Sequence, residues 1–466
     1  MKKLAISLVG FFLVFSAFVG TSQAAPKEFV VGCNFTLSGP AAFVGISIQR
    51  VVEYTCEVIN KEGFVVQGEK YSVKPVFYDN KYIPAESVLN LEKMLTGGIK
   101  FIMSNGSGVT VPLLEKTTAA KVLVMAYASG SRDLTNPKYP LSFRTSPNTE
   151  VAFAVYPWLA KAYPQIKKAA HINCSDEAGF SESETRTKCA KNVGFNNVAN
   201  EFYKRGATDF YPVATKLAVT QPDFIDFGGL SGSRDQGLLA KALREVGYKG
   251  MIAVNYSDPD SFLKITGSDG AEGIILPSAV TEPQNPRQQE LYDWYVKKYG
   301  ASPVGIFYDN ADALFMLIEA VKKANSFDPM KVAEVFRNIR WDSIFGPMYF
   351  GMESVYGIKS SICRPIPTGV IKKGKATHLA TLPWPPDEEI QRLYKDYLVK
   401  SQRRTYEVTL KRITDVLLTL HVTHHESVLQ STESRGALFD RFMRFHKAVP
   451  AGSWVQFAIA RHLQLL

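Results

Sequence analysis

The sequence predicts an α/β protein with two doubly wound lobes, each built from a parallel sheet with helices on both faces. Three observations predict this fold class. The chain has 466 residues, which is too many for one ordinary hydrophobic core. Short apolar runs typical of strands alternate with longer segments of helical periodicity. The alternation stops near residue 145 and then restarts, so the sequence predicts two similar halves.

The first run of alternation starts near residue 27. KEFVVGCNFTL predicts a strand that ends at Leu37, and the helix that follows ends at Gly63, because glycine commonly stops helices. The rest of this run is predicted as strand 71–80, helix 85–98, strand 100–104, helix 109–120 and strand 122–127.

The second run starts with a helix at 150–163. It continues with strand 167–173, helix 183–194, strand 222–229, helix 233–247 and strand 249–255. The helices at 284–300 and 307–324 do not begin a third run, so we expect them to complete the earlier lobes. Short strands punctuated by glycine and proline follow at 345–379, and TLPWPP ends the predicted globular part.

Residues 387–466 do not continue this plan. Their apolar residues have helical spacing with basic residues opposite, and the segment holds five of the seven histidines. His421 and His425 lie one helical turn apart, but no HExxH motif supports a metal site, and an ordinary half-exposed face is the simpler interpretation. A basic amphipathic helix can also lie on a membrane or a partner. We expect a helical or partly disordered extension of unknown role.

Residues 1–25 have the pattern of a secretory signal peptide. MKK is positively charged, LAISLVGFFLVFSAFVG is apolar, and TSQAA offers small residues for cleavage after Ala24 or Ala25. An uncleaved membrane anchor is the rival interpretation, but the apolar run is short for a membrane span. The sequence therefore predicts export through a cleaved signal peptide, and export permits disulfides.

The five cysteines allow more than one pairing. Cys174 and Cys189 are close in sequence and flank a polar segment, so they are the first candidate pair, and Cys33 with Cys56 is a weaker one. One cysteine, such as Cys363, must stay unpaired, and connectivity is not readable from the sequence.

Composition and motifs argue against several function classes. The formal net charge is +10, but lysine and arginine are dispersed, so we expect a solvated basic surface and no nucleic-acid partner. No CxxC, HExxH or GxSxG motif occurs, and no paired carboxylates or triad can be assembled. His171 is expected to be a satisfied core or edge histidine. The sequence therefore predicts no enzyme, no metal site and no cofactor.

The turn SNGSGVTVP lies between a predicted strand and a predicted helix. Gly106 and Gly108 match the start of a GxGxxG fingerprint, but Val111 takes the place of the third glycine. A helix that begins here presents free backbone N–H groups, which suit a small anion such as a carboxylate. Ser107 either binds such a ligand or only caps its own helix.

A second turn follows the strand 122–127 and contains Ala128, Ser129 and Gly130. Both turns should open at the same edge of one sheet, where doubly wound folds bind ligands. In the other half, GGLSGS with Ser231 and VNYSDPD end strands in the same way. Asn255 or Asp258 there can receive an ammonium group, while Asp258 can equally be a turn residue before proline.

These segments, in this order, resemble a known family. The exported start, FTLSGPAAFVG, SNGSG, MAYASGSRDLTNPKYPLSFRTSPN, SFLKITGSDGAEGI and FGPMYFG followed by VYGIK resemble type I periplasmic substrate-binding proteins of ABC importers. The leucine/isoleucine/valine-binding proteins and related amino-acid or amide-binding proteins are the most similar kin. The resemblance covers about residues 27–386.

The resemblance implies two lobes joined by three crossovers, near Ser146, Pro277 and Phe345 in this chain. Lobe 1 would comprise 26–145 and 278–345, and lobe 2 would comprise 146–277 and 346–386. The ligand would lie between the lobes, which close over it. The implied partners are an amino acid or similar small ligand and an inner-membrane ABC permease, with the protein a periplasmic monomer.

The resemblance also assigns ligand contacts residue by residue. It implies that Ser107, Gly108 and the backbone at Ala128, Ser129 and Gly130 hold the ligand carboxylate. Gly130 replaces the serine or threonine that is usual in the family, so one hydroxyl is missing. The aromatic candidates are Phe180 and Phe43, and Ser231, Asn255 and Asp258 are the candidates in the second lobe. A ligand sensor of the same fold is the alternative function, and an enzyme is a less favoured one.

Overall fold

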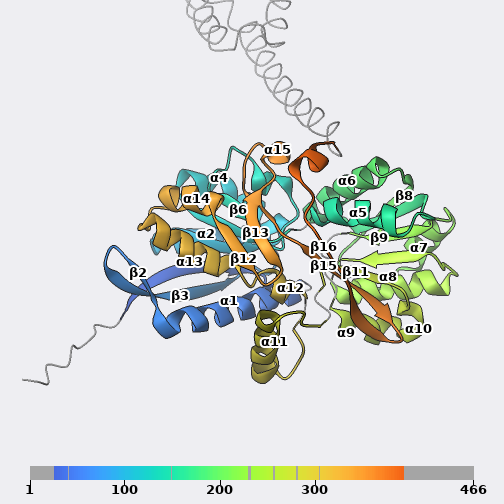
Figure 1. The fold of residues 1–466 in the computed structure, drawn as a ribbon, viewed down its shortest axis with the longest axis horizontal. Coiled ribbons are helices and arrows are strands. Elements are labelled where there is room, and N and C mark those ends of the chain that lie inside the picture. Colours follow the sequence, from blue (N-terminus) through green and yellow to red (C-terminus); the bar gives the residue numbers. More distant parts are fainter. Residues whose placement is uncertain are drawn as a thin grey trace, which may run out of the picture. The chain divides into compact units, whose positions relative to one another are not determined.

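The computed structural model describes residues 26–39, 41–147, 149–228, 232–255, 258–279, 282–303 and 305–392. All of them belong to one compact unit. They form two separate sheets, each covered by helices (Figure 1). We call the first sheet and its helices the first lobe, and the second sheet and its helices the second lobe. The predicted signal peptide, residues 1–25, and the predicted extension beyond residue 392 lie outside the described residues.

The described residues of the first lobe form a nine-stranded sheet with the order β12-β13-β14-β6-β5-β4-β1-β3-β2. Its strands are β1 (Lys27–Phe35), β2 (Phe64–Val66), β3 (Glu69–Asp79), β4 (Phe101–Asn105), β5 (Leu123–Tyr127), β6 (Ser142–Arg144), β12 (Arg340–Ser343), β13 (Gly346–Gly351) and β14 (Ser361–Cys363). The inner strands β4 and β5 are buried along their whole length, as expected for a sheet covered on both faces.

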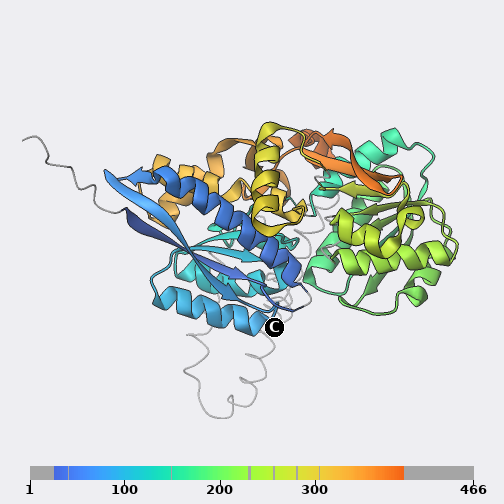
Figure 2. The ribbon, with the colours of Figure 1, turned by 90° about the horizontal axis from the view of Figure 1, so that it is seen from below.

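The helices of the first lobe cover both faces of this sheet. The crossovers from β1 to β3 and from β3 to β4 run in opposite directions, so α1 and α2 lie on opposite faces (Figure 2). The helices are α1 (Ala42–Glu62), α2 (Pro84–Thr96), α3 (Ser107–Thr110), η1 (Val111–Leu113), α4 (Leu114–Ala119), η2 (Arg132–Thr135), α11 (Pro286–Tyr299), α12 (Gly305–Asp309), α13 (Ala313–Ala324), α14 (Pro329–Asn338) and α15 (Glu353–Tyr356).

The described residues of the second lobe form a seven-stranded sheet with the order β16-β15-β11-β10-β9-β7-β8. Its strands are β7 (Lys168–Cys174), β8 (Asn196–Tyr203), β9 (Phe224–Phe227), β10 (Met251–Val254), β11 (Ile275–Pro277), β15 (Ile366–Lys372) and β16 (Lys375–Leu382). Its helices are α5 (Val151–Ala162), α6 (Glu177–Asn192), α7 (Tyr211–Ala218), α8 (Ser233–Glu245), α9 (Pro259–Thr266) and α10 (Ser268–Ala271). The predicted fold class, two doubly wound lobes, is confirmed.

The third crossover lies later in the chain than the sequence predicted. The predicted boundary after Phe345 is wrong, because β13 and β14 belong to the first sheet, and β14 pairs with β6. The chain reaches the second sheet only between Cys363 and Ile366. The sequence of a short edge strand does not indicate which of two sheets the strand joins. Here Phe350 of β13 packs against Phe143 and Phe336 of the first lobe, which holds this strand in the first sheet.

All five cysteines are free and buried, so the predicted Cys174–Cys189 disulfide is wrong, and Cys33 and Cys56 are not paired either. Cys174 ends β7, whereas Cys189 lies in the last part of α6, which runs back along the sheet. Cys189 lies twelve residues, or about 18 Å, along α6 from its first residue Glu177, far beyond the ~7 Å that a disulfide allows between Cα atoms.

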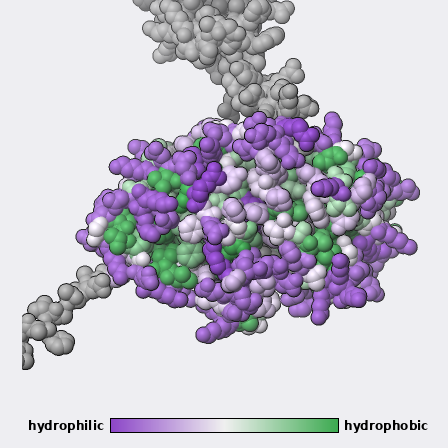
Figure 3. Space-filling model, viewed as in Figure 1, coloured by the Kyte–Doolittle hydropathy of each residue, from purple (hydrophilic) through white to green (hydrophobic). Residues whose placement is uncertain are grey.

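The surface of the described residues is mostly hydrophilic in the view of Figure 3, where the hydrophobic residues form separate patches. Within the described part of the chain, no helix has the length and apolar character needed to cross a membrane. No group of histidine, cysteine or acidic residues in that part is arranged to hold a metal ion.

In each lobe one long helix packs tightly against the end of the strand that precedes it. A Cβ atom at Gly45 of α1 would lie 2.0 Å from the carbonyl oxygen of Thr36, and one at Gly179 of α6 would lie 1.8 Å from that of Cys174. Glycine at these two positions therefore lets the helix start reach the end of the strand, and it fixes the edge at which each sheet can meet a ligand.

We predict that Gly45→Ala and Gly179→Ala each lower the free energy of unfolding by at least about 1–3 kcal/mol, since backbone must shift to admit the methyl group. Chemical denaturation of the purified chain measures the change. Gly97→Ala is the matched control, because Gly97 has φ −77° and a Cβ there would be 3.5 Å from its neighbours. Equal stability of all three variants would contradict the packing argument.

Candidate functional site

Each sheet has one switch point, where the connections that follow two adjacent strands run toward opposite edges of the sheet. In the first lobe this switch point lies between β1 and β4, and in the second lobe it lies between β7 and β9. Loops that leave such strands separate from each other and leave room at the carboxyl edge of the sheet, which is where open α/β sheets bind ligands. The two predicted turns and the second-lobe candidates follow strands at or beside these points.

The two turns of the first lobe meet, as the sequence predicted. Asn105 at the end of β4 pairs with Tyr127 at the end of β5, so both turns start at the same level of the sheet. The buried Oγ of Ser107 accepts hydrogen bonds from the backbone N–H groups of Gly130 and Ser131, both at 2.9 Å. We call this arrangement the serine clasp. Ser107 does not cap its own helix, which is only four residues long and starts after Gly106.

The clasp leaves fewer free amides than the sequence suggested. The amide of Ala128 donates to Ser146 Oγ at 3.1 Å, and that of Gly130 donates to Ser107. The hydroxyl of Tyr82 lies beside Gly108, and a Cβ atom there would be 3.7 Å from it. The side chain of Ser129 donates to the Tyr127 carbonyl oxygen at 2.8 Å. The expectation that the Ala128 and Gly130 amides stand free for a ligand is therefore wrong, because the hydroxyls of Ser146 and Ser107 already accept from them.

Tyr82 is a residue that sequence reasoning missed. Lys81 and Tyr82 both have positive φ angles, 54° and 58°, and this left-handed backbone turns the Tyr82 ring onto the first turn. A Cβ at Gly106 would lie 2.6 Å from the ring. Burial raises the pKa of the Tyr82 hydroxyl to about 12. The only signal in the sequence was the lack of side chains at Gly106 and Gly108, which makes room for the ring.

The turn after β5 also reaches the second lobe. Ser131 Oγ donates to Glu177 Oε1 at 2.9 Å, and Arg132 forms an ion pair with Glu184. Both acidic residues lie on α6, which follows the switch-point strand β7. The carboxyl edges of the two sheets therefore face each other.

A second contact between the lobes runs through Tyr82. The guanidinium of Arg205 lies 5.6 Å from the centroid of the Tyr82 ring, within cation–π range. Arg205 is held by an ion pair of 2.6 Å with Asp176, which also caps α6 by accepting the amide proton of Gly179 at 2.9 Å. The first lobe therefore contacts the start of α6 at two places, through Ser131 and through Tyr82.

The structure separates the second-lobe candidates. Asn255 is fully buried at the end of β10, where its Nδ2 donates to Asp226 Oδ1 at 2.9 Å and to the carbonyl oxygen of Phe227 at 3.0 Å. Asp258 caps α9 and accepts from the amide of Asp260 at 3.2 Å. The geometry therefore favours Asn255 at the sheet edge, with Asp258 as a turn residue. Ser231 lies outside the described residues.

The two aromatic candidates lie in different surroundings. A Cβ at Gly232 in the second lobe would be 2.8 Å from the ring of Phe43, so Phe43 lies where the lobes meet. Phe180 is 51% exposed and packs against Phe202 of the edge strand β8 at 5.2 Å. Phe180 is therefore not brought to the other candidates. Its place in the first turn of α6 directs it toward β8, which the sequence pattern did not reveal.

A buried ionic cluster occupies the second-lobe switch point. Arg186 of α6 pairs with Glu182 one turn earlier and with Asp226 of β9 at 2.8 Å, and all three side chains are at most 1% exposed. Burial raises the pKa of Glu182, and the two carboxylates raise the pKa of Arg186 despite its burial. We call these three residues the ionic cluster. Nothing in the spacing of the sequence showed that Asp226 would join the helical pair.

His171 adjoins this cluster as a satisfied core residue, as the sequence predicted. Its Nε2 lies 2.8 Å from Asn197 Oδ1, and its Nδ1 lies 3.3 Å from the hydroxyl of Tyr156, which donates to Asp226 at 2.6 Å. Burial lowers the pKa of His171, so the ring is neutral near pH 7. No nucleophile adjoins His171 in these contacts.

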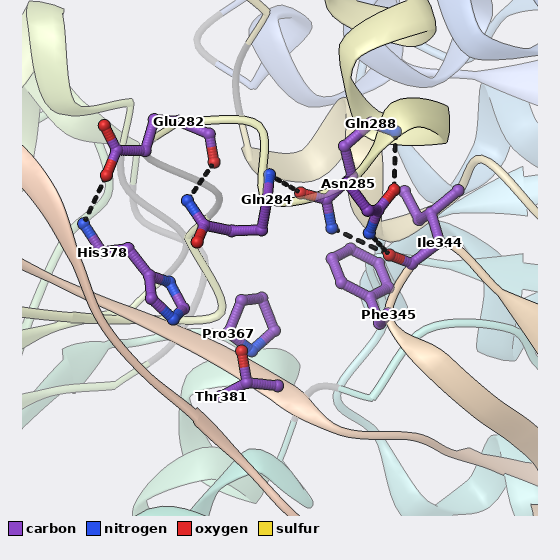
Figure 4. Close-up of a pocket in the computed structure, with 9 residues that line it drawn as sticks. All are labelled: Glu282, Gln284, Asn285, Gln288, Ile344, Phe345, Pro367, His378 and Thr381. Atoms are coloured by element: carbon purple, nitrogen blue, oxygen red, sulfur yellow. Dashed lines mark hydrogen bonds between the residues drawn. The ribbon is translucent and has the colours of Figure 1, made fainter.

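Two hollows lie away from the turns. A cavity of about 70 Å³ sits at the crossovers (Figure 4), where Asn285 Nδ2 and Gln288 Nε2 both donate to the carbonyl oxygen of Ile344 at 2.8 Å. A groove of about 560 Å³ runs between α1 and α11 beside Trp294. The cavity is much smaller than the ~300–1,000 Å³ of typical ligand sites. The groove lies on the outer face of one lobe.

Comparison with known proteins gives a family match. Residues 28–355 match the family model of periplasmic binding proteins. The chain is 26% identical over 318 residues to Leu/Ile/Val-binding protein homolog 3 of Brucella melitensis. This alignment covers 68% of this chain and 84% of that protein.

Solved structures show the same fold. The branched-chain amino acid binding protein LivJ of Streptococcus pneumoniae, in complex with isoleucine, aligns with a TM-score of 0.64 at 17% identity, over 77% of this chain and 100% of that one. A solute-binding protein of an ABC transporter from Rhodopseudomonas palustris, in complex with 3,4-dihydroxybenzoic acid, aligns with a TM-score of 0.65 at 20% identity, over 77% and 98%.

We predict that Ser107→Ala lowers the free energy of unfolding by about 1–3 kcal/mol, because two buried amide donors lose their acceptor. Thermal or chemical denaturation measures this loss. Ser142→Ala is the control, since Ser142 is also buried but its hydroxyl only donates, at 2.7 Å, to the Leu134 carbonyl oxygen. If the Ser107 variant were as stable as the wild type, the clasp would not hold the turns together.

Proposed function

The chain belongs to the periplasmic binding protein family, and from that premise we propose that it is a solute-binding protein. It captures an amino acid or a related small carboxylate or amide between its two lobes and delivers the ligand to an ABC importer. The observation that carries this proposal is the serine clasp, which joins the two first-lobe turns directly opposite α6 of the second lobe.

The clasp gives Ser107 one remaining role toward a ligand. Its hydroxyl oxygen accepts two N–H groups at 2.9 Å, and a hydroxyl has two lone pairs and one hydrogen. The O–H group is therefore left to donate, and the two amides polarise it. A ligand carboxylate is a strong acceptor for such a donor, and each charge-assisted hydrogen bond of this kind is worth roughly 1.5–3 kcal/mol.

The ligands named for the similar proteins support a carboxylate. The Brucella protein is named for leucine, isoleucine and valine, and the two solved structures hold isoleucine and 3,4-dihydroxybenzoic acid. These ligands differ in their ammonium and ring groups but share one carboxyl group and a largely apolar body. Burial of that body adds about 25 cal/mol per Å².

Tyr82 completes the first-lobe side of the proposed site. It lies against Gly106 and faces Arg205 across the lobes. When the lobes open, this stacking is lost and the Ser107 hydroxyl becomes accessible. We infer that the pair Tyr82–Arg205 shuts the site on its outer side and shields the bound carboxylate from water.

The remaining parts of the proposal concern the setting of the protein. We infer that residues 1–25 direct export and that the mature protein works in the periplasm as a monomer. Its partner is the permease of an ABC importer, which reads the closed form of the two lobes. The proposed role is binding and delivery without turnover of the ligand.

We predict that Arg205→Met weakens the binding of L-isoleucine or 3,4-dihydroxybenzoate, whichever the wild type binds, by about 2- to 30-fold. This range corresponds to the ~0.5–2 kcal/mol of a cation–π contact. Isothermal titration calorimetry measures the affinity, and small-angle X-ray scattering measures closure.

Arg244→Met is the matched control. Arg244 also lies over a tyrosine ring, that of Tyr248, at 5.7 Å, and its hydrogen bonds to described residues all stay within the second lobe. The Arg244→Met variant should have a lower free energy of unfolding than the wild type but the same ligand affinity. Equal weakening by both variants would contradict closure through Arg205, and a wild type that binds no amino acid and no small carboxylate would contradict the proposed function.

A further inference from the structure

Asn173 is a buried polar residue with no visible structural purpose. It is the penultimate residue of β7, at the second-lobe switch point, and its side chain is fully buried. Within the described part of the chain, neither its Oδ1 nor its Nδ2 has a hydrogen-bond partner. An asparagine can make four hydrogen bonds, so this residue leaves its whole capacity unused.

Other unpaired atoms belong to residues that surround the same strand ends. In the ionic cluster, Arg186 Nη2 and Glu182 Oε1 lack partners among the described residues, and so does Asn255 Oδ1 beside Asp226. A Cβ at Gly228, the residue after β9, would lie 2.4 Å from Asn173 Oδ1 and 2.8 Å from Arg186 Nε. The glycine thus brings Asn173 and Arg186 against the backbone at the switch point.

This concentration of unpaired groups is not what a purely structural network shows. More than nine in ten buried polar groups in proteins have a partner, because an unpaired group gives up its bonds to water. Here two donors and three acceptors remain unpaired in four neighbouring residues at a ligand-binding edge. The contacts between α6 and the first-lobe turns show that the lobes are together in this conformation. These atoms are therefore available to a group from outside the chain.

The chemistry of these atoms narrows the class of that group. The ionic cluster has one positive and two negative formal charges, so a second carboxylate would be repelled. An ammonium group cannot accept from Arg186 Nη2 or Asn173 Nδ2, because it has no lone pair. A carboxamide has both parts: its oxygen accepts from these two donors, and its NH₂ donates to Glu182 Oε1, Asn173 Oδ1 or Asn255 Oδ1.

We propose that Asn173 and the ionic cluster form a subsite that binds a carboxamide group at the end of the ligand remote from Ser107. This inference rests on the proposed function and narrows it. The transported solute has an acidic group at one end, which meets the first lobe, and an uncharged amide at the other end, which meets the second lobe. Asn173 is a specificity-determining residue, and Arg186 is held in place by its two carboxylates.

The test uses four ligands of similar size that differ only at the remote group. The full chain is titrated by calorimetry with L-asparagine, L-leucine, L-aspartate and L-2,4-diaminobutyrate, which end in an amide, two methyl groups, a carboxylate and an ammonium group. We expect L-asparagine to bind at least tenfold more tightly than each of the others. Equal or tighter binding of any other member overturns the carboxamide subsite and leaves the proposed function standing. No binding of all four overturns the subsite, and no binding of L-isoleucine and 3,4-dihydroxybenzoate as well overturns the proposed function.

The variant Asn173→Leu distinguishes a ligand contact from a structural role. Leucine has nearly the same shape, and Asn173 has no hydrogen bond to lose, so we expect the melting temperature to stay the same or to rise by about 2–4 °C. The preference for L-asparagine over L-leucine should disappear, while the affinity for L-leucine should stay within about threefold. Loss of stability with the preference retained would overturn the assignment.

Asn80→Leu is the matched control, because Asn80 is equally buried but both of its side-chain polar atoms are hydrogen-bonded. Its Oδ1 accepts from Thr36 Oγ1 at 2.7 Å and from the Tyr82 amide at 2.9 Å, and its Nδ2 donates to the Asn34 carbonyl oxygen at 3.0 Å. This variant should lower the melting temperature by several degrees, the opposite of the Asn173 variant. If both variants lower it equally, Asn173 is a structural residue and the subsite proposal fails.

Discussion

The hydrogen bonds from Gly130 and Ser131 to Ser107 Oγ are the constraint on which the rest of the site depends. They hold two turns together that are separated by a whole helix–strand unit, and they use both lone pairs of one buried hydroxyl. The same turn then reaches α6 of the second lobe through Ser131. One serine therefore links strand register in the first sheet to contact between the lobes.

The two lobes differ in how the polar groups at their switch points are paired. In the first lobe the polar groups of the turns are paired with each other, so the turns keep their shape without a ligand. In the second lobe the ionic cluster and Asn173 are buried with atoms left unpaired. An unpaired buried group costs about 1–3 kcal/mol, so these second-lobe groups are unfavourable until a partner is supplied. Under the proposed carboxamide subsite, a ligand that supplies the partners removes this penalty.

Much of the fold followed from the sequence, because strand and helix periods are local signals that survive in any tertiary context. The alternation gave two doubly wound lobes, and the small residues after β4 and β5 indicated the two turns that meet. What failed depends on partners distant in sequence. The Ala128 amide donates to Ser146, β14 joins the first sheet through β6, and Asp226 completes the Arg186 pair from another strand. No spacing rule reports such contacts.

The most direct test of the central claim is a crystal structure of the full chain with a bound amino acid. We predict that the ligand lies between the two switch points, with its carboxylate within hydrogen-bond distance of Ser107 Oγ and its remote group beside the end of β7. A ligand found in the crossover cavity, in the α1–α11 groove, or between the lobes without contact to Ser107 would contradict the account.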